Sequence, residues 1–233
     1  MVEWYPSDLQ ELKSLINRFL VRGGKKSSEI HGLVVPHAGY IYSGAVAGKG
    51  FACLKNKKFE KAIIVGPSHY ASFSGIRSLD KIKTPFGEPE ILKSDYEKLY
   101  TEEHSVTNQV AFLQFLGINK ILPLVVGHIT EQEAKQAAEH LSEEDALFVF
   151  STDLSHFLEY GEAVITDKHS IEVIQKLDVE NYSEIDACGV FPILIMMHLC
   201  KLKGWKPRLL QYKNSGDITG DNSSVVGYAS FVF

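Results

Sequence analysis

Four short apolar runs, each ending in a glycine, proline or serine turn, most constrain what this chain can fold into. The runs are rich in valine, isoleucine, leucine and phenylalanine, which is typical of buried strands. They lie at 32–35, 61–65, 121–126 and 146–150. Segments with apolar residues at helical spacing alternate with these runs, at 43–55, 94–116 and 130–141. The alternation predicts an α/β fold with a mainly parallel or mixed central sheet flanked by helices.

Capping residues and further periodic segments predict the remaining helices and strands. Ser7 and Gln10 occupy capping-box positions, so we expect an amphipathic helix at 7–21. Thr130 and Glu133 predict a second capping box at the start of a later helix. Further helices are expected near 162–176 and 187–203, and further strands at 208–212 and 225–231, with a turn-rich loop at 215–224 between these strands.

The composition favours some classes of protein over others. Hydrophobic residues make up 45% and charged residues 23%, as in ordinary globular proteins. No repeat, low-complexity segment or linker interrupts the 233 residues, so we expect a single domain over 1–233. A net charge of −5 offers no field for phosphate backbones, and nucleic acid is not an expected partner. The sequence has no signal peptide and no apolar run of roughly 18 residues, which predicts a cytoplasmic protein without membrane contact.

Histidines follow the strand-like runs at equivalent positions, namely His37, His69, His128 and His156. In open α/β sheets, ligands bind beyond the carboxyl ends of the strands, where the loops converge. A single loop histidine is often only bonded to the backbone, but several at equivalent positions predict a histidine-rich site.

An aspartate and a cysteine extend this inventory. Asp153 lies three residues before His156, so one helical turn would place both side chains on one face as an acid and base pair. Alternatively, Asp153 caps a helix and His156 faces solvent. Cys188 precedes Gly189 at the expected start of a helix, where the dipole lowers a thiol pKa. Two histidines with a thiolate or carboxylate suit iron, copper or zinc. Of the three cysteines, Cys53 and Cys200 are expected in the core, and all three as reduced thiols.

Seven motifs follow one another along nearly the whole chain as they do in the MEMO family. They are Trp4-Tyr5-Pro6, Pro36-His37-Ala38-Gly39-Tyr40-Ile41-Tyr42-Ser43-Gly44, Gly66-Pro67-Ser68-His69, Glu103-His104-Ser105, Ser151-Thr152-Asp153-Leu154-Ser155-His156, Ala187-Cys188-Gly189 and Val225-Val226-Gly227-Tyr228-Ala229-Ser230. The chain resembles the microbial branch of this family called AmmeMemoRadiSam system protein B.

The resemblance implies a fold and a set of ligands. The MEMO family is similar to the class III extradiol dioxygenases of the LigB type, which hold non-haem iron(II) with two histidines and a glutamate. By position, His37 and His69 match the metal histidines, Cys188 replaces the glutamate, and His156 matches the acid/base histidine. A thiolate at this position favours copper, so iron(II) or copper(I) is the expected cofactor, with no nucleotide. Where the family usually has Glu-His-Ser-Leu-Glu-Val-Gln, this chain has Thr107 in place of the second acidic residue.

Three functions remain open from the sequence. The first is a metal-dependent redox or dioxygenase-like enzyme, with His156 moving protons and Asp153 orienting it. Tyr40, Ser68 and His104 are then expected to contact substrate. The second is a scaffold that binds metal or peptide without catalysis, with an AMMECR1-domain protein and a radical SAM enzyme as the partners that the family resemblance implies. The third is thiol-dependent hydrolysis through Cys188 and His156.

Overall fold

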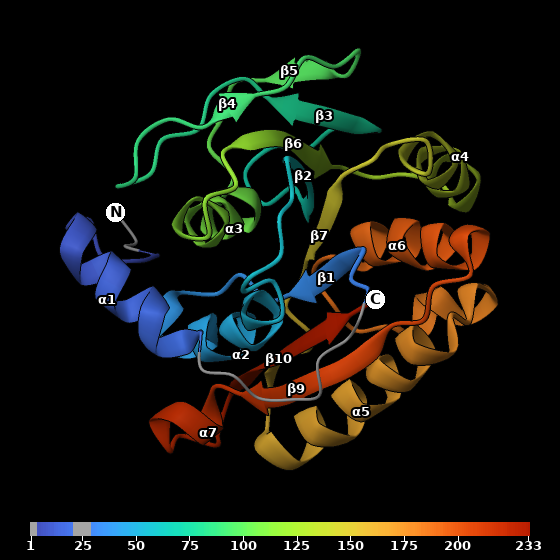
Figure 1. Ribbon diagram of the computed structural model, residues 1–233. Coiled ribbons are helices and arrows are strands. Elements are labelled where there is room, and N and C mark those ends of the chain that lie inside the picture. The colour runs from blue at the N-terminus through green and yellow to red at the C-terminus, as the bar shows by residue number, and fades with distance from the viewer. Residues whose placement is uncertain (1–3, 21–28) are drawn as a thin grey trace.

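The computed structural model describes residues 4–20 and 29–233 (Figure 1). Its strands are β1 (Gly32–Val35), β2 (Lys61–Pro67), β3 (Ile76–Leu79), β4 (Glu90–Ile91), β5 (Glu97–Leu99), β6 (Lys120–Val126), β7 (Leu147–Ser151), β8 (His156–Leu158), β9 (Arg208–Asn214) and β10 (Val225–Val232). Its helices are α1 (Leu9–Phe19), α2 (Tyr40–Ala52), α3 (His104–Phe115), α4 (Glu131–Leu141), α5 (Tyr160–Lys176), α6 (Val190–Lys203), α7 (Gly216–Thr219) and the 3-10 helix η1 (Val179–Glu184).

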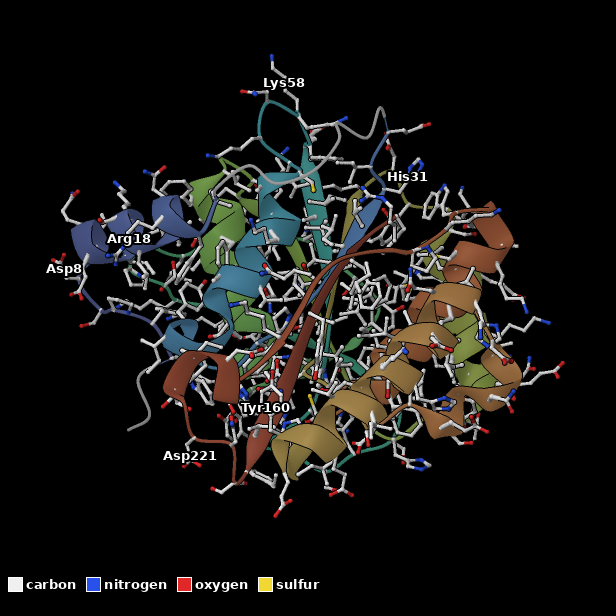
Figure 2. All side chains as sticks on the ribbon, turned by 90° about the horizontal axis from the view of Figure 1, so that it is seen from below. Asp8, Arg18, His31, Lys58, Tyr160 and Asp221 are labelled. Atoms are coloured by element: carbon white, nitrogen blue, oxygen red, sulfur yellow. The ribbon has the colours of Figure 1, made fainter. Side chains whose placement is uncertain are left out.

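The described strands form one mixed sheet, ordered β5-β3-β6-β2-β7-β1-β10-β8, with β4 added to β6 and β9 added to β10. Its centre, β6-β2-β7-β1, is parallel, while β3 and β10 run antiparallel to their neighbours β6 and β1. The α/β fold with a mixed sheet is therefore confirmed. All four parallel strands end at the same edge of the sheet. In Figure 2, Lys58 and His31 mark the edge where β2 and β1 begin, and Tyr160 marks the opposite edge.

Helices cover both faces of this sheet. Figure 2 shows α1, α2 and α3 on one side and α4, α5 and α6 on the other. Alternate residues of one strand point to opposite faces, and β1 follows this rule: Val34 belongs to the core under α4 and α6, while Leu33 and Val35 belong to the core under α2 and α3. Because both faces are covered, the parallel strands read as unbroken apolar runs.

The first two helices touch through glycines. A methyl group added to Gly48 would lie 2.6 Å from the carbonyl oxygen of Phe19, and one added to Gly44 would lie 2.4 Å from the Phe19 ring. These two glycines, one turn apart, let α1 lie directly on α2. The contact brings the segment before α1 close to the loop before α2, since the Tyr40 N–H donates to the Trp4 carbonyl at 2.8 Å.

Two of the expected helix boundaries were wrong. Asp8 caps α1 in place of Ser7, because its carboxylate accepts from the N–H groups of Gln10 and Glu11, and the predicted end at residue 21 lies outside the described residues. The helix expected over 94–116 begins only at His104. The capping box of Thr130 and Glu133 is confirmed.

The first part of that predicted helix instead contributes β5, which pairs with β3. Pairing with a strand distant in sequence overrides the local helical spacing there. In the described ranges, no helix is both long enough and apolar enough to cross a membrane.

Candidate metal centre

Three donor side chains from separate segments meet at the carboxyl edge of the sheet. His37 follows β1, His69 follows β2, and Cys188 comes just before α6. One ligand atom of each lies within 4.8 Å of those of the other two. The structure thus brings together the three residues that the sequence predicts as metal ligands. Their depth differs, since His37 is buried, Cys188 is half-buried and His69 is exposed.

The imidazole of His37 is held on both sides. Its Nε2 lies 3.2 Å from Cys188 Sγ, and its Nδ1 lies 2.9 Å from Ser151 Oγ. Two ligand atoms bound to one tetrahedral metal at roughly 2.0–2.3 Å are about 3.5 Å apart. The His37 and Cys188 donors therefore already have a separation close to that of ligands of a common ion. Burial and the neighbouring His69 lower the pKa of His37 well below its usual value, which keeps the ring neutral.

Glu103 orients the second histidine. Its carboxylate is fully buried and accepts from the backbone N–H of His69 at 2.6 Å and of Ser105 at 3.1 Å. The same carboxylate lies 2.9 Å from His69 Nδ1. Burial alone would raise the pKa of Glu103, but the hydrogen bonds from His69 and Ser105 outweigh it and the pKa is lowered. A carboxylate bound to Nδ1 leaves Nε2 of His69 for a metal, as in carboxylate–histidine–metal triads.

His69, Glu103 and His104 also form a second group with metal-ligand spacing. The hydrogen-bonded alignment of Glu103 on His69 Nδ1 leaves no room for an ion between these two atoms, so we assign Glu103 an orienting role. His104 Nδ1 lies 3.3 Å from the same carboxylate, but without hydrogen-bond alignment, and this nitrogen is buried without a hydrogen-bond partner among residues 4–20 and 29–233. Burial and the neighbouring His37 lower the pKa of His104 to about 3.

Trp4 covers His104 from the outside. The two rings stack with centroids 3.9 Å apart and planes 6° apart. Trp4 also lines an adjoining pocket of about 950 Å³, together with Tyr5 and Glu102 among others. Thr107 lines this pocket as well, so the missing family carboxylate would lie there and outside the cluster of ligand atoms.

The expected activation of the Cys188 thiol by a helix start was wrong. Burial and the nearby Asp153 carboxylate raise its pKa to about 12, and the N–H of Asp153, which donates to the sulfur at 3.3 Å, only partly offsets this. The helix itself begins two residues later. Gly189 lets the segment that carries Cys188 lie close to the end of β7. A methyl group on Gly189 would lie 2.6 Å from Thr152 Oγ1 and 2.8 Å from the Ser151 carbonyl.

Asp153 and His156 do not share a helical turn, and Asp153 is not a helix cap. Residues 152–155 form a loop between β7 and β8, and His156 begins β8. Asp153 Oδ1 accepts from the His37 N–H at 2.7 Å, so this carboxylate holds the His37 loop. Burial raises its pKa despite this bond. His156 is near enough to interact electrostatically with both Asp153 and His37.

Other predicted residues lie outside the cluster. His128 is exposed and packs against Phe191, with ring centroids 5.1 Å apart, so only part of the expected convergence of strand-end histidines occurs. Tyr40 is buried in the core and its hydroxyl donates to the Asn108 carbonyl at 2.6 Å. The Ser68 hydroxyl closes its own turn by donating to the Ala71 carbonyl at 2.7 Å.

The sequence reasoning missed the residues that support the ligands. The sequence predicts no role for Glu103, Ser151 or Gln109, although Glu103 and Ser151 lie within two of the seven motifs. Gln109 donates to Ser151 Oγ at 2.9 Å and to the Pro36 carbonyl at 3.0 Å. Polar residues one helical turn apart at 104–109 were a signal in the sequence, but their burial and their partners were not visible there.

Comparison of the sequence with known proteins identifies relatives over nearly its whole length. A family profile described as Memo-like protein matches residues 2–232. The chain belongs to the Memo-like family. A MEMO1 family protein of Sulfolobus acidocaldarius is 37% identical over 231 residues, which cover 86% of this chain and 81% of that protein. One of Aquifex aeolicus is 35% identical over 257 aligned positions, covering 99% of this chain and 96% of that protein. The Memo-like family thus spans nearly the whole chain, including every residue of the candidate metal centre.

Proposed function

We propose that this Memo-like chain is a metal-dependent oxidoreductase in which His37, His69 and Cys188 hold non-haem iron or copper. The observation that carries the proposal is the convergence of these three donors within 4.8 Å, from three separate segments. Isolated surface histidines do not show such convergence. The orienting contact to Glu103 adds support, because metal-binding histidines usually have their second nitrogen bonded in this way.

The donor set fits the expected ions. Imidazole nitrogen suits iron, copper and zinc, and a sulfur donor shifts the preference toward copper(I). Metal binding would displace the Cys188 proton, which burial and Asp153 hold on the free thiol. When bound, iron or copper would supply a redox-active Lewis acid to dioxygen or to an oxidisable substrate.

The remaining residues have distinct places in this proposal. His156, at the rim, moves a proton to or from the substrate. Asp153 fixes the His37 loop through its backbone contact and contributes its charge near His156. His104 is the expected substrate contact whose ring adjoins the ligands, with its centroid 4.4 Å from that of His69. Tyr40 and Ser68 support the walls of the site through their bonded hydroxyls.

Metal content tests the proposal. The protein is purified without oxygen, reconstituted separately with iron(II), copper(I) and zinc(II), and analysed by elemental mass spectrometry. We expect one iron or copper ion per chain, lost in His37→Ala and in Cys188→Ser. Cys53→Ser is the matched control, because Cys53 is half-buried at the end of α2 and belongs to neither ligand group. Failure of the unaltered chain to bind either ion, or equal uptake by all variants, contradicts the proposal.

A second candidate function, a scaffold for an AMMECR1-domain protein and a radical SAM enzyme, has its own support. Large apolar side chains beside the predicted site residues are exposed: Tyr70 by 55% next to His69, and Phe157 by 77% next to His156. Exposed apolar groups around a site favour binding of another macromolecule. Affinity purification from a native host tests this function, and a paired Tyr70→Ser and Phe157→Ser variant should lose the partners while keeping its metal.

A further inference from the structure

Gln109, Ser151 and His37 form a directed chain of hydrogen bonds behind the metal centre. All three side chains are buried, with 1%, 0% and 2% of their surface exposed. The Gln109 amide nitrogen contacts both the Pro36 carbonyl and Ser151 Oγ. A carbonyl oxygen can only accept, so the atom of Gln109 facing Pro36 is the nitrogen, and both of its hydrogens are used.

This orientation fixes the direction of the next bond. Because Gln109 donates to Ser151 Oγ, the hydroxyl proton of Ser151 must find a different acceptor. Within the described part of the chain, the contacts of Ser151 Oγ leave His37 Nδ1, at 2.9 Å, as that acceptor. An unpaired buried hydroxyl would be destabilising. The Ser151 hydroxyl therefore donates to Nδ1 of the metal-free ring.

The proton of the neutral His37 ring is then on Nε2, the nitrogen that faces Cys188 Sγ at 3.2 Å. The Cys188 thiol can donate its own hydrogen to the Asp153 carbonyl, 3.7 Å away, so its sulfur can accept from the Nε2–H of His37. A metal needs the lone pair of Nε2 and hence the opposite tautomer. Loading must move the ring proton to Nδ1 and turn the Ser151 hydroxyl away.

We infer that Gln109 and Ser151 are positioning residues that hold metal-free His37 in the tautomer unfit for metal binding. This chain of hydrogen bonds from Gln109 through Ser151 to His37, here called the relay, therefore opposes binding of the metal. The inference deepens the proposed metal site and rests on it for its effect on affinity. Its effect on the ring proton concerns the metal-free protein alone. Such a relay selects for ions that bind strongly enough to reorganise it.

One isosteric substitution reverses the relay. Gln109→Glu puts an oxygen in place of the amide nitrogen. As a buried, neutral acid it donates its hydroxyl proton to the Pro36 carbonyl, and the same oxygen accepts from the Ser151 hydroxyl. Ser151 is then free to accept from a proton on His37 Nδ1, which exposes the lone pair of Nε2. The matched control is Asn108→Asp on the same helix. Asn108 is equally buried and donates to the His37 carbonyl at 2.7 Å, but it has no contact with the ring or with Ser151.

Nitrogen-15 NMR of histidine-labelled, metal-free protein measures the tautomer, with His37 assigned by the signals lost in His37→Asn. We expect the proton on Nε2 in the unaltered chain and in Asn108→Asp, and on Nδ1 in Gln109→Glu. We also expect Gln109→Glu to bind zinc(II) roughly five- to a hundredfold more tightly than Asn108→Asp, as relief of an unpaired hydroxyl implies. If Gln109→Glu does not fold, Ser151→Ala should give a mixture of tautomers.

The outcomes separate this inference from the proposed function. A proton on Nδ1 in the unaltered metal-free chain overturns the inference, as does the same shift in both acid variants. If the tautomers respond as expected but no variant binds iron, copper or zinc, the relay stands and the proposed metal function fails.

Discussion

Two tryptophan–histidine stacks in this molecule have nearly the same geometry and very different surroundings. Trp4 lies on His104 with centroids 3.9 Å apart, and Trp205 lies on His31 with centroids 4.1 Å apart. His104 adjoins the rings of His37 and His69. His31 lies at the opposite edge of the sheet, where β1 begins, and belongs to neither group with metal-ligand spacing among the described residues. The convergence of donors distinguishes the site, and the stacked pair by itself does not.

Removing a histidine at each edge tests that distinction most strongly. His69→Ala deletes a predicted ligand, so we expect metal affinity to fall at least about a hundredfold, as loss of one of three donors implies. His31→Ala deletes a histidine stacked in the same way as His104 and should leave affinity within about twofold. Titration with iron(II) and copper(I) under nitrogen gives both values. Similar losses in the two variants would show that binding does not depend on the cluster.

The next contrast is between a buried and an exposed carboxylate–histidine pair. Glu103→Gln leaves one oxygen for the two N–H groups of His69, so the ring loses its orientation and we expect about 10–100-fold weaker metal binding. Glu184 approaches His169 at 2.7 Å, but both side chains are about half exposed, and Glu184→Gln should leave the metal affinity unchanged. Competition with a chelator of known affinity measures the ratio. Unchanged affinity in Glu103→Gln would remove its orienting role.

The sequence predicted the parts of this site that follow local rules. Apolar runs ending in turns located β1, β2, β6 and β7, and parallel strands bring the residues that follow them to one edge. That placed His37 and His69 correctly before any contact was known. Cys188 depended on family resemblance, because no spacing rule links it to residues about 150 positions earlier in the chain.

The supporting contacts could not be predicted because they depend on tertiary distances. Glu103 bonds to a residue 34 positions away, and Ser151 to one 114 positions away. The predicted lowering of the Cys188 pKa was wrong for the same reason. A helix start can be read from the sequence, but the burial and the Asp153 carboxylate that dominate this pKa cannot. Likewise, the first part of the helix predicted at 94–116 was wrong. β5 forms there because it pairs with β3, and local periodicity does not reveal such a long-range pairing.

Two glycines give a smaller contrast. Gly189→Ala would force its new methyl group against Thr152 Oγ1 and the Ser151 carbonyl, both closer than 3 Å, and push Cys188 away from His37. We expect several-fold weaker metal binding and a loss of about 1–3 kcal/mol in the free energy of unfolding. At Gly161, on α5, no atom of the described residues lies within 4 Å of the added carbon, so Gly161→Ala should bind metal normally. Denaturant unfolding and metal titration of both variants measure these effects. Normal binding by Gly189→Ala would show that the Cys188 position tolerates displacement.

The smallest expected effect returns to the two tryptophans, which are the only ones in the chain. Trp205→Phe leaves Trp4 as the sole indole, stacked on a histidine whose ring centroid lies 5.3 Å from that of His37. Copper(II) bound at the cluster should quench its fluorescence, because quenching by electron transfer requires close approach. Trp4→Phe leaves Trp205 at the other edge and should respond little. Zinc(II), with a filled d shell, controls for conformational change, since it binds similar ligands without redox chemistry. Equal quenching of both indoles would place the copper away from this edge of the sheet, and a response to zinc(II) alone would show that Trp4 moves on loading.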